Sequence, residues 1–357
     1  MTPEAEFSEA VSGLAPIALR TAATLRLADH IAAGHNTATL LADRIGADSD
    51  VLGRVLRFLV VRGVFGEPEP DVFALTPLSV TLLDGHPSKL CAWLDEGGIG
   101  GRMDTATRAL TVAVRTGRSP YASIHGDTFY QDLAKYRSGP DFNTLRQSHS
   151  ESFADEITAV FPWEGVQHVV DVGGGTGAFP EALMRRYSGL HTTLVDLPDA
   201  VAAAVRRITA AGLEKRFTAA PGSFFHPLPS GADVYTLINV LHNWNDDDAV
   251  RILRRCAEAA DRNSTVVVVE RLIDGADQRA ITTMDLRMLL LLSGKERSLT
   301  QLRGVAEAAG LVHGQRSATA VGLDWVTFHT SGTQQPAADN RARGPSVLSQ
   351  EFGSDIR

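Results

Sequence analysis

Val169-Val170-Asp171-Val172-Gly173-Gly174-Gly175-Thr176-Gly177 is the stretch that decides the fold of this chain. Its apolar residues predict a buried strand, and its glycines predict a tight turn that opens a helix. Glycine suits such a turn because it adopts positive φ and lets a ligand approach the main chain closely. The spacing Gly173-x-Gly175-x-x-Ala178 also satisfies the loose dinucleotide-binding pattern. By itself the turn therefore predicts a nucleotide-like ligand without identifying it.

Acidic residues around this turn discriminate between the candidate ligands. Asp171 directly precedes the glycines, where its charge would repel a pyrophosphate and attract a sulfonium with an ammonium tail. Asp196 follows Gly177 by nineteen residues, and an acid there can bind both ribose hydroxyls of NAD or of S-adenosylmethionine. Gly222-Ser223-Phe224-Phe225 offers an adenine a polar contact and an aromatic face. The combination favours S-adenosylmethionine; a plain strand-to-helix turn and a solvent-exposed Asp196 are the alternatives.

After Pro162 the chain alternates between expected strands and helices, which is typical of a parallel α/β sheet. Strands are expected at residues 166–172, 191–197, 233–241 and 265–271, and helices at residues 178–187, 200–211 and 246–261. Residues 318–329 predict two further strands about Gly322. The tail, residues 331–357, loses apolar content and is expected to be disordered.

Residues 1–85 predict a winged-helix pattern, with helices at 16–31, 39–45 and 51–62, Asp50 as a helix cap, and hairpin strands at 63–65 and 72–75. This pattern raises DNA binding as an alternative. However, the segment holds six Arg, no Lys and eleven acidic residues, a net charge of −5, whereas a phosphate-binding surface is basic. We therefore expect a dimerisation domain, followed by a helical linker or substrate lid at 86–161 with a break at Gly100-Gly101.

The composition is that of a globular protein, with 44% hydrophobic and 21% charged residues. The net charge of −8 argues against nucleic acid as a partner. No run approaches the ~20 apolar residues that cross a bilayer, and the first residues lack a signal pattern, so we expect a cytoplasmic protein without membrane contact. Cys91 and Cys256 show neither metal-type spacing nor a disulfide framework, and no metal is expected.

Several ordered motifs make the chain resemble the small-molecule O-methyltransferases, typified by plant caffeic-acid-type enzymes and their bacterial relatives in polyketide and antibiotic pathways. The motifs are residues 17–29, 171–177, 240–246 (Val-Leu-His-Asn-Trp-Asn-Asp) and 293–297 (Ser-Gly-Lys-Glu-Arg). The resemblance implies a Rossmann-like class I methyltransferase domain at 162–330, mostly parallel with a C-terminal antiparallel hairpin, behind the winged-helix dimerisation domain. It also implies S-adenosylmethionine as cofactor, a small aromatic or polyketide-derived acceptor, and a homodimer.

Expected cofactor contacts are Asp171, Gly173, Gly175, Asp196, Gly222, Ser223 and Phe224, and the resemblance adds Ser150 beside the amino-acid end of the cofactor. Two residues depart from the family pattern. Ser223 stands where the family usually has Asp, so a hydroxyl or the main chain would serve the adenine. Arg146 stands where plant members usually have Met, and its guanidinium is expected to bind the cofactor carboxylate in a bidentate manner.

Methyl transfer to a phenol needs a positioned base, because the phenol has a pKa of about 10 and a histidine, titrating near 6.5, can remove its proton as attack begins. His242, expected at the end of the strand over residues 233–241, is the candidate base. By resemblance, Glu270 and Glu296 fix its tautomer and stabilise its charged form. The expected acceptor contacts are Asn243 and Trp244, with Met103, Met284 and Met288 as adaptable walls, although core packing explains these methionines equally well.

Two other functions stay open from the sequence. Some bacterial relatives on this scaffold keep the cofactor but catalyse hydroxylation, decarboxylation or pericyclic steps without methyl transfer, and fold alone cannot exclude such a reaction. Retention of His242 together with both glutamates favours methylation. The second alternative is a non-enzymatic regulator that binds DNA through the winged helix, which the acidic charge of residues 1–85 opposes.

Overall fold

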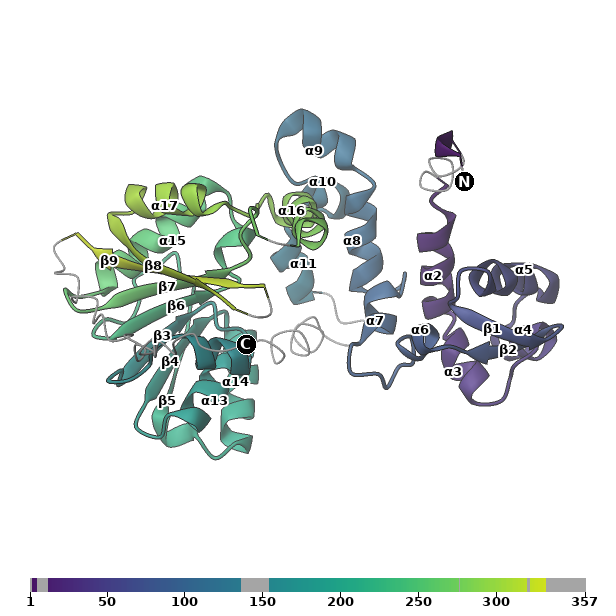
Figure 1. Cartoon of the computed structure of the whole chain (residues 1–357), viewed down its shortest axis with the longest axis horizontal. Coiled ribbons are helices and arrows are strands. Elements are labelled where there is room, and N and C mark those ends of the chain that lie inside the picture. Colours follow the sequence, from purple (N-terminus) through teal and green to yellow (C-terminus); the bar gives the residue numbers. More distant parts are fainter. Residues whose placement is uncertain (1, 5–11, 136–153, 276, 320–321, 332–357) are drawn as a thin grey trace, which may run out of the picture.

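The computed structural model describes residues 2–4, 12–135, 154–275, 277–319 and 322–331, and every structural statement below concerns these residues. An N-terminal group of elements, a middle group of helices and a large sheet domain follow one another along the longest axis (Figure 1). Helix α16 (Gln278–Leu292) follows the sheet domain in sequence, but it lies among the helices of the middle group, where it packs against α8 (Ile99–Thr107).

The N-terminal group holds short helices and one antiparallel hairpin. The strands are β1 (Phe65–Glu69) and β2 (Val72–Leu75). The helices are α2 (Leu14–Thr24), α3 (Leu27–Ala32), α4 (Ala38–Ile45), α5 (Ser49–Val60) and α6 (Pro77–Val80). The apolar faces of α2 to α5 and of both strands share one buried cluster that includes Leu27, Leu41, Leu56 and Phe65. This cluster gives the N-terminal group a core of its own.

Two details of this group differ from the sequence-based expectation. The single helix expected over residues 16–31 is divided into α2 and α3, because Arg26 between them takes a left-handed φ of 52°. Asp48 caps α5, since its Oδ1 accepts a hydrogen bond from Val51 N at 2.9 Å, whereas Asp50 lies in the first turn. Left-handed φ is uncommon for a residue such as arginine, so nothing in the sequence indicated the division at Arg26.

The middle group consists of α7 (Leu90–Leu94), α8, α9 (Leu110–Thr116), α10 (Tyr121–His125) and α11 (Phe129–Lys135). The break expected at Gly100-Gly101 is wrong, because both glycines lie inside α8. A Cβ at Gly100 would collide with the main-chain oxygen of Trp93, so the glycine permits close packing of α8 on α7. None of the helices in the described ranges is both long and apolar enough to cross a membrane.

The third group is built on a seven-stranded sheet in the order β5-β4-β3-β6-β7-β9-β8. Strands β3 to β7 pair in parallel, and β9 runs antiparallel to both β7 and β8. The strands are β3 (His168–Val172), β4 (His191–Asp196), β5 (Phe217–Pro221), β6 (Val234–Ile238), β7 (Thr265–Glu270), β8 (Leu311–Ala318) and β9 (Asp324–Thr330). The mostly parallel sheet and its C-terminal antiparallel hairpin are therefore as predicted.

Helices cover both faces of this sheet (Figure 1). Helices α15 (Asp246–Ala259) and α17 (Leu299–Ala308) pack on the face that includes Val170 and Val268. Helix α13 (Ala178–Arg186) and residues 154–161 pack on the opposite face, which includes Val169 and Val267. Helix α14 (Pro198–Ala210) packs against β4 and β5. Adjacent strand residues thus point to opposite apolar layers, as strands buried on both faces require.

Three strand predictions need correction. Strand β5 (Phe217-Thr218-Ala219-Ala220-Pro221) was not expected, because this edge strand holds only one large apolar residue, Phe217, and therefore shows little strand pattern in the sequence. Strand β6 ends at Ile238 rather than at residue 241, because Asn239 has a positive φ of 51° and a short 3₁₀ turn, η2 (Leu241–Asn243), follows. Strand β8 already begins at Leu311, before the segment expected to hold the hairpin.

Candidate active site

The carboxyl ends of strands β3 to β7 lie at one edge of the sheet, which is where open α/β sheets bind ligands. The glycine turn follows β3. A Cβ at Gly174 would collide with the Asp171 carboxylate, and one at Gly173 would lie 2.8 Å from Cγ2 of Val240. Gly175, with φ of 59°, has open space where a Cβ would be. The turn therefore packs tightly around Asp171 but leaves open space next to Gly175, where a ligand could approach the main chain.

Asp171 is buried beneath this turn, with 1% exposure. The Thr236 hydroxyl on β6 donates to Asp171 Oδ1 at 2.8 Å. Burial, with a smaller contribution from the charge of Asp196, raises the pKa of Asp171 to about 7, although the hydrogen bond from Thr236 acts to lower it. A cation placed beside Asp171 would favour its ionised form. The carboxylate is therefore suited to a positively charged ligand.

Asp171→Asn is expected to change how stability depends on pH. Folding raises the pKa of Asp171 from 3.8 to about 7, so its protonated form stabilises the folded state at low pH and this contribution is lost as the pH rises to 7. The loss is about 3 kcal/mol between pH 5 and pH 8. Asparagine keeps an acceptor for Thr236, so relative to wild type the variant should gain about that free energy of unfolding between these pH values. Urea unfolding of both proteins tests this; a constant difference would contradict it.

Asp196, at the end of β4, connects the glycine turn with the segment after β5. Its Oδ2 accepts a hydrogen bond from Gly175 N at 2.8 Å, and its Oδ1 accepts one from Leu197 N at 2.6 Å. Its main-chain oxygen accepts a hydrogen bond from Gly222 N at 2.9 Å. The carboxylate is partly buried and keeps lone pairs for further donors. The structure thus brings Gly175, Asp196 and Gly222 together.

The segment after β5 supplies an aromatic ring to the same place. A Cβ at Gly173 would lie 3.5 Å from Cε1 of Phe224, so this ring lies next to the glycine turn. The Ser223 hydroxyl accepts a hydrogen bond from Phe225 N at 3.3 Å and thus orders its own loop. Gly222 has open space where a Cβ would be.

These residues fit S-adenosylmethionine. The buried acid Asp171 suits the cationic end, Asp196 suits the ribose hydroxyls, and Phe224 suits the flat adenine. Arg146 and Ser150, the other two expected contacts, lie outside the described residues. In the described part of the chain, no three His, Cys, Asp or Glu side chains are grouped so that they could hold a metal ion.

His242 lies on η2, four residues beyond the end of β6, and not on a strand as expected. Its ring Nδ1 lies 2.8 Å from Glu296 Oε1, and the Glu296 side chain is only 1% exposed. Glu270, at the end of β7, contacts the main chain: the His242 N–H donates to Glu270 Oε1 at 2.9 Å. The two glutamates therefore act on different parts of the same residue. Glu296 orients the imidazole, and Glu270 fixes the backbone that carries it.

Because Glu296 contacts the ring of His242 and Glu270 contacts its main chain, we expect conservative substitutions of the two glutamates to have unequal effects on kcat. Burial raises the pKa of Glu270, and a glutamine there still offers an oxygen to the His242 N–H, so Glu270→Gln is expected to change kcat less than about threefold. Glu296→Gln removes the charge next to the ring and can reverse the imidazole tautomer, so it is expected to lower kcat about 10²-fold or more. Steady-state kinetics measure both variants. Equal losses would contradict the division.

The residues expected around the acceptor come from three elements. Trp244 directly follows η2, and Asn243 Nδ2 donates to Asn239 O at 3.2 Å, so Asn243 stabilises its own turn. Met103 on α8 packs against a buried cluster that includes Leu291 of α16. Met284 is half-buried and Met288 is buried on α16, which packs against both α8 and η2. The structure places these side chains on neighbouring elements, but a role in binding an acceptor stays a prediction.

Aromatic contacts around Trp244 reveal a residue that the sequence did not indicate. The Tyr130 ring on α11 stacks on the Trp244 ring, with centroids 6.4 Å apart and an interplanar angle of 23°. The edges of Phe224 and Phe225 meet Trp244 at centroid distances of 5.8 and 4.9 Å. Trp244 thus connects the cofactor side of the site with the middle helical group. No motif could have identified Tyr130, because its position depends on how α11 packs.

Comparison with known proteins identifies both parts of the chain. Residues 9–85 match the O-methyltransferase dimerisation domain, and residues 107–312 match the O-methyltransferase domain. A 2,7-dihydroxy-5-methyl-1-naphthoate 7-O-methyltransferase from Streptomyces carzinostaticus is 44% identical over 300 residues, covering 83% of this chain and 89% of that protein. An aclacinomycin 10-hydroxylase from Streptomyces purpurascens is 38% identical over 345 residues, covering 94% of this chain and 92% of that protein.

A solved structure supports the same assignment. An O-methyltransferase from neocarzinostatin biosynthesis, in complex with S-adenosyl-L-homocysteine and 1,4-dihydroxy-2-naphthoic acid, is 41% identical with a TM-score of 0.81, covering 89% of this chain and 96% of that chain. These matches confirm the predicted fold class, a dimerisation domain followed by a class I methyltransferase domain. This chain belongs to the S-adenosylmethionine-dependent O-methyltransferase family.

Proposed function

We propose that this enzyme transfers a methyl group from S-adenosylmethionine to a phenolic hydroxyl of a small aromatic or polyketide-derived natural product, with His242 as general base. One observation carries the proposal. Val240 lies against Gly173 of the glycine turn, and two residues further on His242 is paired with the buried Glu296. The expected cofactor turn and the expected base therefore lie next to each other at the same edge of the sheet.

The arrangement around His242 supports a defined proton path. The hydrogen bond to Glu296 Oε1 favours the tautomer with its proton on Nδ1, which leaves Nε2 to accept the proton of the acceptor hydroxyl. The carboxylate of Glu296 then stabilises the imidazolium that forms. Bound S-adenosylmethionine supplies an electrophilic methyl on a positively charged sulfur. The remaining task of the protein is to hold the acceptor oxygen in line with that methyl.

The aromatic surroundings favour a planar acceptor. The Trp244 ring, two residues after His242, stacks with the Tyr130 ring, and Met103, Met284 and Met288 would form adaptable walls. The Streptomyces carzinostaticus relative is named for a naphthoate acceptor, and the similar solved structure from neocarzinostatin biosynthesis holds a dihydroxynaphthoic acid. A fused-ring hydroxyaryl acid is therefore the acceptor class to test first.

We also propose that the chain forms a homodimer through residues 1–85, with residues 86–161 as linker and lid and the catalytic domain at 162–330. The match of residues 9–85 to the dimerisation domain supports this division. Leu14, Ile17 and Val51 also expose apolar side chains on α2 and α5. Light scattering that gives the mass of a monomer at micromolar concentration would contradict the dimer.

The reaction is tested by product mass. Purified protein is incubated with S-adenosylmethionine and a panel of hydroxynaphthoic acids, and each product is analysed by mass spectrometry. A gain of one methyl together with formation of S-adenosylhomocysteine is the expected result. The aclacinomycin 10-hydroxylase relative makes a non-methylating reaction the second candidate. A product that gains an oxygen, or loses carbon dioxide, without S-adenosylhomocysteine would replace the proposal with that candidate.

A further inference from the structure

We propose that Arg297 is a positioning residue that holds the main chain of the His242 turn in its working conformation. Its Nη1 donates to Leu241 O and its Nη2 donates to Trp244 O, each at 2.8 Å. These two carbonyls flank His242 and Asn243, so one guanidinium binds the turn at both ends. The inference rests on the proposed role of His242 as base.

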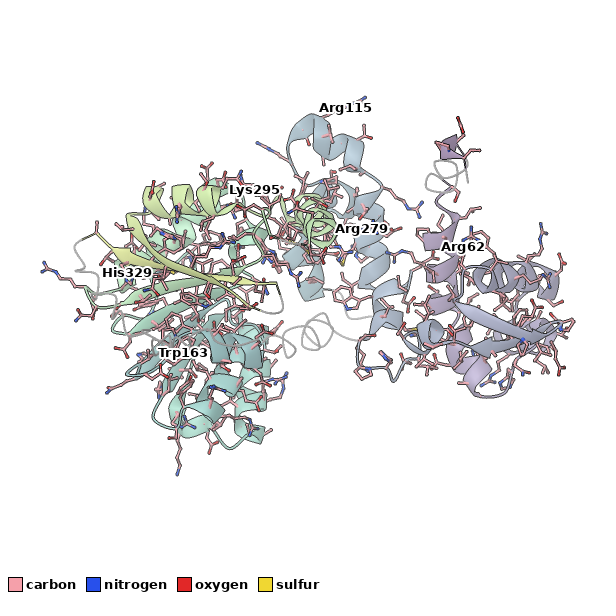
Figure 2. The ribbon with its side chains drawn as sticks, viewed as in Figure 1. Arg62, Arg115, Trp163, Arg279, Lys295 and His329 are labelled. Carbon is pink, nitrogen blue, oxygen red and sulfur yellow. The ribbon has the colours of Figure 1, made fainter. Side chains whose placement is uncertain are left out.

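The guanidinium of Arg297 is buried, and its charge is balanced by a carboxylate next to the His242 turn. Its side chain is fully buried, at 0% exposure, although charged side chains are rarely buried unless all their donors are satisfied. Asp246 at the start of α15 provides the counter-charge, with Nε to Oδ1 at 3.0 Å. Asp246 also pairs with Lys295 at 2.6 Å, and the Lys295 side chain, labelled in Figure 2, is 36% exposed. Of these two cations, Arg297 binds the turn as well as Asp246, whereas Lys295 pairs with Asp246.

The preceding residues of the same loop act on His242 too. A Cβ at Gly294 would collide with the His242 carbonyl oxygen, so the loop touches the turn closely at this point. Glu296 contacts the ring of His242, and its own N–H donates to Asp285 Oδ1 on α16 at 2.8 Å. Gly294, Glu296 and Arg297 therefore determine both the backbone position and the ring orientation of the proposed base.

The chemistry of the side chain explains why arginine occupies this position. Its planar fork carries donors that reach two carbonyls and a carboxylate at once, whereas a lysine ammonium is a point charge on a flexible stem. Lysine at 297 would keep the charge but would not hold both ends of the turn. Catalytic groups need placement within about 0.5 Å, so a loosened turn lowers the rate more than it lowers binding.

Arg297→Lys tests the inference, with Lys295→Met as the matched control. We expect Arg297→Lys to lower kcat about 10²-fold, while calorimetry shows cofactor affinity within about threefold of wild type. Lys295→Met also removes a cation from Asp246 but leaves the bonds from Arg297 to the turn, so its kcat should stay within about threefold. If the lysine variant does not fold, Arg297→Gln, which removes the buried charge, is judged by the same criterion.

The His242→Ala background separates positioning from general destabilisation. If Arg297 acts through His242, adding Arg297→Lys to His242→Ala should lower the residual kcat less than about threefold. Two outcomes would overturn the inference: a near wild-type kcat for Arg297→Lys, or an equal loss in both backgrounds. If His242→Ala itself retains full turnover, the proposed function fails instead. The single variants thus distinguish failure of the inference from failure of the base assignment.

Discussion

His242→Ala is expected to lower kcat 10²- to 10⁴-fold while cofactor affinity stays within about threefold. The variant keeps the glycine turn and Asp196, because Asp196 is hydrogen-bonded to the main chain of Gly175, Leu197 and Gly222, and the substitution leaves these contacts in place. It removes the group that accepts the phenolic proton as attack begins. Rate measurements under saturating acceptor give kcat, and calorimetry gives the affinity for the cofactor.

The pH dependence of the same variant gives a sharper test. Without the base, turnover depends on the small fraction of acceptor that is already ionised, so kcat of His242→Ala should rise towards pH 10, the ordinary pKa of a phenol. An acceptor acidified by an electron-withdrawing substituent should lose much less from the substitution. A loss that is equal for acidic and ordinary phenols at all pH values would exclude His242 as the base.

Asp196→Ala is expected to weaken cofactor binding on the order of 10²-fold, or about 3 kcal/mol. The carboxylate would accept charge-assisted hydrogen bonds from the ribose hydroxyls, and the substitution also removes the acceptor for Gly175 N at 2.8 Å. Loss of that contact frees the glycine turn. Calorimetric titration with S-adenosylhomocysteine measures the affinity without turnover.

Asp196→Asn is the matched control for these two effects. Asparagine keeps an oxygen that can accept from Gly175 N, but it carries no charge. We expect it to bind the cofactor more tightly than the alanine variant and more weakly than wild type. Unchanged affinity in both variants would exclude the ribose assignment, and equal large losses would assign the effect to the charge.

The sequence predicted the fold correctly where neighbouring residues in the chain allow only one backbone conformation. Gly173, Gly175 and Gly177 all take positive φ, a local backbone requirement that the glycines themselves indicate without the fold. The valine-rich segment of β7 and the alternation of strands with helices likewise predicted a parallel sheet, which the structure has. The same reasoning failed at Gly100, where a glycine permits close helix packing rather than a break.

The roles of individual side chains in the site depend on contacts between segments that are distant in the sequence. Glu270 and Glu296 were expected to have one role, but Glu270 binds the backbone of His242 and Glu296 binds its ring, because they approach from different elements. The position of Tyr130 on Trp244 depends on how the middle helices pack against the sheet domain. No periodicity or motif in the sequence predicts such contacts, because they depend on how whole helices and strands pack.

By itself the sequence determined the order of the elements, the glycine turn and the kinds of side chain available at the strand ends, since these depend on residues that are neighbours in the chain. Only the tertiary structure decided the protonation of Asp171, whose pKa of about 7 arises from burial, and the partners of Arg297. Burial and hydrogen-bond geometry are properties of the packed molecule, because they depend on atoms that the chain brings together only on folding.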